Sequence, residues 1–167
     1  MSALIYASWG QNERYTPLQL AQYAATLANK GKRMKPQFVD KVTTYDGVPV
    51  KTLEPVIMDQ EQFPEQYWNA IFTGMQKVGK QGFEGFNYSV AAKTGTSTQT
   101  VGGKSVDNAV FIAFAPVEDP KLAVAIVIPE GGYGSWGAAP IARKMFDAYD
   151  KFYGLGAAPN PAIQISE

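Results

Sequence analysis

The chain has 167 residues, of which 46% are hydrophobic and 18% are charged, which is typical of one globular domain with its own core. Lysine plus arginine and aspartate plus glutamate each number 15, so the zero net charge gives no electrostatic reason to expect nucleic acid as a partner. The absence of cysteine and histidine excludes disulfides, thiol catalysis, a complete Ser-His-Asp triad and histidine-ligated metals. Magnesium or calcium sites made of carboxylates alone stay open, but the sequence has no Asp-rich loop of the EF-hand kind. We predict no cofactor and no metal site.

The first third of the chain predicts a helix followed by a hairpin. Thr16 is a good N-cap, Pro17 suits the first helical position, and apolar residues follow at helical spacing, so we expect a helix over 16–30. Further along, Asp46-Gly47 lies between two β-prone runs, which is a strong signal for a small surface hairpin.

A second amphipathic helix is expected over 64–78, and we expect Gly79, Gly82 and Gly85 to break the chain into a loop after it. Its apolar stripe is interpreted as core rather than as a binding site. The stripe consists of Trp68, Ile71, Phe72, Met75 and Val78.

Three strands are expected next, over 88–98, 108–115 and 122–128, and their short connections predict an antiparallel meander. The last two are apolar on both alternating sets of positions, which is typical of strands covered by helices on both faces. A final helix is expected over 138–152, and residues 154–167 have no periodicity and predict a loose tail. The order of elements predicts an α+β fold, an antiparallel sheet flanked by helices.

The segment with chemical meaning is Lys93-Thr94-Gly95-Thr96, on the first predicted strand. Lys93 offers a positive charge to a substrate carboxylate, and the hydroxyls of Thr94 and Thr96 can hold the same group. Gly95 lets a ligand's backbone lie flat against the strand, so an extended peptide could pair there by β-augmentation. A backbone N–H near Thr96 could help to hold an oxyanion. For an isolated Lys-Thr-Gly, a solvated strand lysine is the competing explanation.

This motif belongs to a series of segments that resemble the transpeptidase domain of penicillin-binding proteins, whose signature set includes Lys-Thr-Gly and Ser-x-x-Lys. The similar segments, in the family's order, are residues 10–11, 15–21, 28–31, 72–78, 91–96, 111–116, 122–127 and 138–142. The resemblance is closest to class B, elongation-type enzymes. It implies that residues 1–153 are the C-terminal portion of one transpeptidase domain and that 154–167 are a tail.

The family's nucleophile motif is missing. No serine has a lysine three positions later, and Ser-x-Asn is also absent, although in the family these elements carry the acylated serine, its lysine base and a proton-relay serine. The resemblance thus implies a fragment with no catalytic residue of its own, whose substrate-binding residues are Lys93, Thr94, Gly95 and Thr96. The isolated chain is not expected to acylate, whereas the intact parent is expected to be a serine-type D-alanyl-D-alanine transpeptidase of peptidoglycan synthesis.

The partners that the resemblance implies are the peptidoglycan stem peptide and β-lactams in the intact parent, and the remaining N-terminal part of the domain. Self-association of the fragment is a further expectation, because its sheet lacks that cover. The parent is expected at the extracytoplasmic face of the bacterial membrane, held by an N-terminal anchor outside this chain.

Two rival functions stay open: a β-lactamase of the same fold, and a non-catalytic β-lactam-sensing or interaction module. Tyr133 and Trp136 also have two interpretations, as residues of a connecting loop or as lining of the open end of the cleft.

Overall fold

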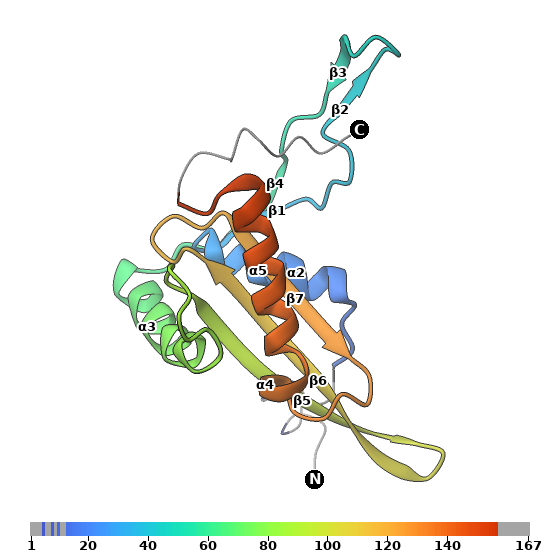
Figure 1. Cartoon of the computed structure of the whole chain (residues 1–167), viewed down its shortest axis with the longest axis vertical. Coiled ribbons are helices and arrows are strands. Elements are labelled where there is room, and N and C mark those ends of the chain that lie inside the picture. The colour runs from blue at the N-terminus through green and yellow to red at the C-terminus, as the bar shows by residue number, and fades with distance from the viewer. Residues whose placement is uncertain (1–4, 6–7, 9, 11–12, 157–167) are drawn as a thin grey trace.

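The computed structural model describes residues 5, 8, 10 and 13–156, and its centre is a three-stranded antiparallel sheet with helices on both faces (Figure 1). The strands are β5 (Ala91–Val101), β6 (Lys104–Ala115) and β7 (Leu122–Ile128), in the order β5-β6-β7. The predicted α+β fold and meander are confirmed. Strand β5 begins and ends later than the predicted range 88–98, and β6 begins earlier than the predicted range 108–115. Both strands continue as a paired ribbon to a turn at Gly102-Gly103, where both residues have positive φ.

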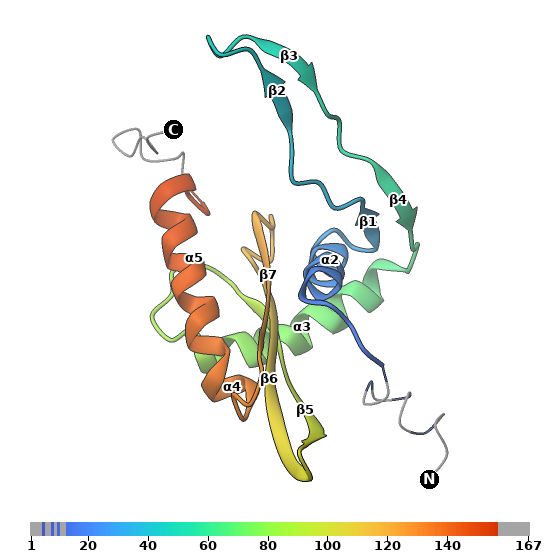
Figure 2. The same ribbon diagram turned by 90° about the vertical axis from the view of Figure 1, so that its right-hand side faces the viewer.

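Helices lie on opposite sides of the sheet, as the edge-on view shows (Figure 2). On one face lies α2 (Pro17–Ala28), and on the other lies α5 (Ala139–Tyr153), which follows the short α4 (Gly134–Gly137). The predicted start of α2 is confirmed by a capping box: Gln19 N–H donates to Thr16 Oγ1 (3.2 Å), and Thr16 N–H donates to Gln19 Oε1 (2.8 Å).

Each face of the sheet has its own hydrophobic core. The core under α2 consists of Ala28, Trp68, Phe72, Met75, Ala91 and Phe114. The core under α5 is built mainly from alanine and phenylalanine: Phe83, Ala92, Ala109, Phe111, Ala113, Ala115, Ala139, Ala142 and Phe146, with Val90, Val124, Ala138 and Leu155. The strand alanines in these two cores are 0% exposed, so each helix packs closely against the sheet backbone.

The predicted end of the second helix is wrong. Helix α3 (Glu65–Gly82) continues through Gly79 and Gly82, where the sequence predicted a loop. Gly79 is a contact residue: a Cβ at this position would lie 2.1 Å from the carbonyl oxygen of Val90, just before β5. The glycine therefore lets α3 pack directly against the chain that enters the strand. The predicted core stripe is confirmed at Trp68, Phe72 and Met75, whereas Ile71 is exposed.

Two smaller ribbons extend from the body. The predicted hairpin around Gly47 is confirmed as β2 (Lys41–Thr43) paired with β3 (Pro49–Thr52). It projects away from the helices on a second pair that was not predicted, β1 (Lys32–Met34) with β4 (Ile57–Gln60) (Figure 2).

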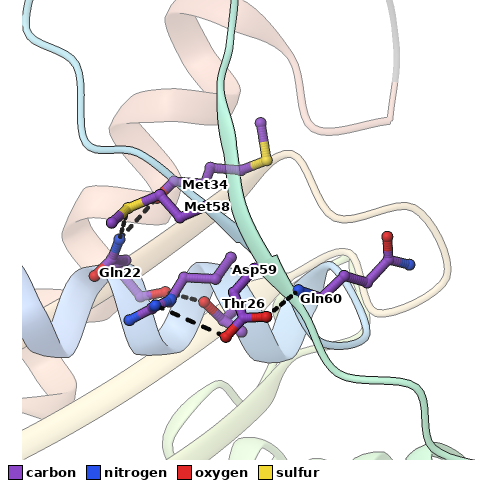
Figure 3. Close-up of polar contacts among 7 residues, drawn as sticks. Gln22, Thr26, Met34, Met58, Asp59 and Gln60 are labelled. Atoms are coloured by element: carbon purple, nitrogen blue, oxygen red, sulfur yellow. Dashed lines mark hydrogen bonds and ion pairs between the residues drawn. The ribbon is translucent and has the colours of Figure 1, made fainter.

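The β1–β4 pair is attached to α2 by polar contacts (Figure 3). Gln22 Nε2 donates to the carbonyl oxygen of Met34 on β1 (2.7 Å) and to Met58 Sδ on β4 (3.6 Å). The Arg33 guanidinium lies 3.8 Å from the Asp59 carboxylate and links β1 to β4. Gln22 thus contacts both strands of the pair from which the hairpin extends.

A tyrosine ties the segment before β5 to the last helix. Tyr88 Oη donates to Asp150 Oδ1 (2.9 Å), which also accepts from Leu155 N–H (2.8 Å). The bond to Asp150, reinforced by desolvation and by the carboxylate's charge, raises the pKa of Tyr88 above its ordinary value of 10. The predicted tail lies almost entirely outside the described residues.

This bond predicts a pH-dependent stability at the alkaline end. Because the folded pKa is raised, the contribution is complete below the unfolded pKa and is lost as pH rises through the folded pKa. Between about pH 9 and pH 12, the urea midpoint of the wild type should therefore fall more than that of Tyr88→Phe, which cannot titrate there. Parallel curves for the two proteins would contradict this role of Tyr88.

Candidate functional site

Residues 93–96 lie on β5 where the strand leaves the cover of α3. Lys93 is exposed, and Thr94, Gly95 and Thr96 are half-buried. Lys93 projects from the same face as Ala91, the face that α2 covers. Helix α2 lies mainly over β6 and β7, and the side chains of Lys93, Ser97 and Gln99 on this face are exposed, so this face of β5 is uncovered beyond Ala91 in the described part of the chain. The Lys93 ammonium donates to the carbonyl oxygen of Thr94.

The threonines of the motif project from the opposite face, because side chains alternate along a strand. Thr94 lines a small pocket of about 240 Å³ on the α5 side. The other lining residues are Val78, Gln81, Gly82, Phe111, Ser135 and Ala139. A carboxylate that contacts both Lys93 and the threonine hydroxyls would therefore have to lie at the edge of β5, where both faces can be reached.

The chain itself does not require glycine at position 95. The φ of Gly95 is not positive, and an added Cβ would meet Val110 Cβ at 3.4 Å, an ordinary van der Waals distance. Gly134 differs, since a Cβ there would lie 2.3 Å from Val110 O and 2.6 Å from Gly95 O. Because Gly134 covers the α5 side of Gly95, the Cβ that Gly95 lacks would point to the open side shared with Lys93. The missing side chain leaves room for a ligand.

Gly95→Ala is therefore expected to separate binding from folding. The stability of the chain should stay the same or rise by less than about 1 kcal/mol, because alanine fits and restricts the unfolded chain more than glycine does. In the intact parent that the sequence resemblance implies, the rate of labelling by a fluorescent penicillin is expected to fall about tenfold, since the methyl group would occupy the ligand's space. A large loss of stability would show instead that Gly95 serves packing.

One buried polar residue beside the motif was not predicted. Asn108, on β6, is 8% exposed; its Nδ2 donates to the backbone oxygen (3.2 Å) and the hydroxyl (3.3 Å) of Ser97. Its Oδ1 accepts from Gln99 Nε2 (3.3 Å) and from Glu130 N–H (3.1 Å). Asn108 thus joins β5, just beyond Thr96, to the loop after β7. The available sequence signal was a lone amide at the start of a long apolar run.

The glycine-rich segment after β7 forms α4, with Gly134 packed against the backbone of the motif strand. Tyr133 and Trp136 flank this contact and are 67% and 85% exposed. Both are placed near the motif strand, and a role in lining a cleft stays a prediction. Within the range that the structure describes, no three acidic side chains gather where they could hold a metal ion.

The comparison with known families agrees with this arrangement. Residues 2–147 match the model described as "Penicillin binding protein transpeptidase domain". The chain belongs to this family. The predicted resemblance to class B, elongation-type members is also confirmed by the relatives that the chain matches.

Curated relatives of this transpeptidase-family chain are similar over most of its length. Peptidoglycan D,D-transpeptidase MrdA of Haemophilus influenzae is 34% identical over 155 residues, which cover 80% of this chain and 23% of the relative. Penicillin-binding protein 2A of Bacillus subtilis is 32% identical over 137 residues, or 72% of this chain and 19% of the relative. The chain therefore spans about a fifth to a quarter of these proteins.

Solved structures show the same fold. Penicillin-binding protein 2B of Streptococcus pneumoniae superposes with a TM-score of 0.79 at 30% identity, covering 90% of this chain and 27% of that one. Penicillin-binding protein A of M. tuberculosis, solved as a ceftriaxone acyl-enzyme complex, gives a TM-score of 0.71 at 30% identity, with 80% and 32% covered. The helices that the structure describes include none that is both long and apolar enough to cross a membrane.

Proposed function

We propose that this chain is the substrate-binding part of a serine-type peptidoglycan D,D-transpeptidase, with residues 1–153 forming the C-terminal portion of its transpeptidase domain. The observation that carries the proposal is the position of Lys93-Thr94-Gly95-Thr96 at a sheet edge, beside a strand face that the described residues leave uncovered. The named relatives include peptidoglycan D,D-transpeptidases, which supports this reaction class for the whole protein.

In the proposed reaction, a serine from outside this chain attacks the penultimate D-alanine carbonyl of a stem peptide. The peptide bond breaks, the terminal D-alanine leaves, and the acyl-enzyme passes its acyl group to an amine of a neighbouring stem peptide. Lys93 and the hydroxyls of Thr94 and Thr96 hold the terminal carboxylate at the edge of β5, and a β-lactam carboxylate takes the same place. The Thr96 backbone N–H shares the oxyanion hole, and no step requires a cofactor.

The nucleophile and the missing cover come, in this proposal, from the remaining N-terminal part of the domain. Two surfaces support such a partner. In the described sheet β7 is an edge strand although its residues are mostly half-buried. Large apolar side chains are also exposed on α2 and just before it. Those side chains are Tyr15, Leu18 and Tyr23. The same surfaces would drive self-association of the isolated chain.

We place the whole protein at the extracytoplasmic face of the bacterial cell membrane, where peptidoglycan is cross-linked, anchored by an N-terminal segment outside this chain. This location is part of the same proposal and rests on the reaction class.

Incubation with a fluorescent penicillin tests the proposal. Labelling of the full-length protein, and not of this chain alone, is the expected result after denaturing electrophoresis. A label that is rapidly released by hydrolysis would indicate the β-lactamase alternative. A stable label without cross-linked product from stem-peptide substrates would indicate a sensing module. Covalent labelling of the isolated chain would show that the nucleophile has been misplaced.

A further inference from the structure

The three-stranded sheet becomes a two-stranded ribbon at one row of residues. Strand β7 pairs with β6 only as far as the row Thr96–Ala109–Ile128, and beyond this row β5 and β6 continue alone (Figure 1). A two-stranded ribbon is less stable and twists more strongly than strands within a larger sheet. Thr96, whose backbone N–H the proposed reaction uses, therefore lies in the last row that β7 supports.

Asn108 lies in the first row beyond this junction, opposite Ser97, and among the described residues it is the only buried polar one. Its side chain uses its full hydrogen-bonding capacity. The amide nitrogen donates to the backbone oxygen and the hydroxyl of Ser97, and the amide oxygen accepts from Gln99 Nε2 and from Glu130 N–H. Aspartate could not donate these bonds and leucine could make none, so the position calls for an amide.

The bond from Glu130 fixes the loop that leads to α4. Glu130 has a φ of 56°, a backbone conformation that residues other than glycine rarely adopt, and Asn108 Oδ1 holds its N–H. Four residues further along the chain, Gly134 packs against the backbone of Gly95 on the α5 side. Asn108 thus joins the strand just after the motif to the loop that covers the motif from behind.

We propose that Asn108 is a positioning residue for the acylation step. By joining β5 just after Thr96 to the loop that carries Gly134, it keeps the Thr96 N–H directed at the place where the oxyanion develops. This inference rests on the proposed function and adds to it a residue that acts through the backbone rather than by touching the substrate. Because an oxyanion donor depends on direction and distance, a shift of the strand at this junction would slow acylation without releasing the carboxylate held by Lys93.

Stopped-flow acylation of the full-length protein by a chromogenic cephalosporin tests this role, since a series of concentrations separates the limiting acylation rate constant from the apparent dissociation constant. Asn108→Leu keeps a side chain of similar size without hydrogen bonds, and Asn108→Ala leaves room for water to replace them. In both variants the limiting rate constant should fall about tenfold, a part of the roughly 100- to 1,000-fold loss that removal of a whole oxyanion donor causes. The apparent dissociation constant should change less than about twofold, because the carboxylate contacts stay in place.

Two further variants separate positioning from stability. Ser97→Ala removes a hydroxyl but keeps the backbone oxygen that Asn108 bonds, so its limiting rate constant should stay within about twofold of the wild type. Val124→Ala opens a cavity in the core under α5, two strands away from the motif, and should lower the urea midpoint without slowing acylation. The amplitude of the acylation burst counts the folded molecules, so an unfolded fraction lowers the amplitude and not the rate constant.

The outcomes separate the two proposals. An unchanged limiting rate constant in the Asn108 variants would overturn the positioning role and leave the proposed function intact. Loss of the burst in both variants would also overturn it, since Asn108 would then serve the fold, and so would an equal fall in Ser97→Ala or a change confined to the dissociation constant. A full-length wild-type protein that no cephalosporin acylates would overturn the proposed function itself.

Discussion

Lys93→Ala in the full-length protein should lower the second-order rate constant of penicillin acylation by about 100-fold. A charge-assisted contact to a carboxylate is worth roughly 1.5–3 kcal/mol, and about 2.7 kcal/mol corresponds to this factor. Because the Lys93 side chain is exposed and takes no part in either core, the variant should unfold at the same urea concentration as the wild type. Stopped-time labelling with a fluorescent penicillin measures the rate.

Lys104→Ala is the matched control for this prediction. Lys104 is also an exposed strand lysine, on the neighbouring strand of the same ribbon, but it pairs with Val101 at the far end. Its loss should change the acylation rate less than twofold. Equal effects of the two substitutions would indicate general electrostatic attraction of the anionic ligand and would remove the specific role given to Lys93.

Gly79→Ala is expected to have the largest effect on stability. The new methyl group would lie 2.1 Å from the carbonyl oxygen of Val90, so that α3 would have to move away from the start of β5. Overpacking typically costs about 1–3 kcal/mol, and we expect the upper end of this range because the backbone cannot rotate aside as a side chain can. Urea unfolding followed by circular dichroism would report the loss.

Gly74→Ala in the same helix should have the opposite sign. Gly74 is exposed on α3, and an added Cβ would meet nothing within 4 Å. Alanine in an exposed helix interior should therefore stabilise the protein by about 0.5–1 kcal/mol. If both variants were stabilised, the close approach of Gly79 to Val90 would not exist in solution.

The sequence correctly predicted those elements whose signal lies in adjacent residues and whose tertiary contacts do not override that signal. The N-terminal cap at Thr16, the turn at Gly47 and the strand over 122–128 all have signals that depend on near neighbours, and the structure confirms each. The candidate site was identified by the series of segments that resemble a known family, and its place on a strand was predicted from local sequence. Lys93-Thr94-Gly95-Thr96 is a compact motif on a β-prone run, so that its strand placement followed from adjacent residues alone.

The features that were missed depend on contacts between distant segments. Gly79 looked like a helix stop, because the pattern contains no sign that Val90 would pack against it. The β1–β4 pair joins short runs on either side of the hairpin, and neither run has a strand pattern of its own. Asn108 links β5 to the loop after β7 through hydrogen bonds to Ser97 and Glu130, which lie 11 and 22 residues away in the sequence.

The alanines that line the sheet have a consequence for how this protein can change over time. Ala92, Ala109 and Ala113 have no exposed surface, so that even one extra methyl group there would push α5 off the strands and disturb Gly134 against Gly95. Under the proposed function, selection for altered β-lactam affinity would therefore find few tolerated substitutions in this layer. We expect such variants to occur instead at exposed positions, in the part of the β5–β6 ribbon beyond β7 and in the segment that carries Tyr133 and Trp136.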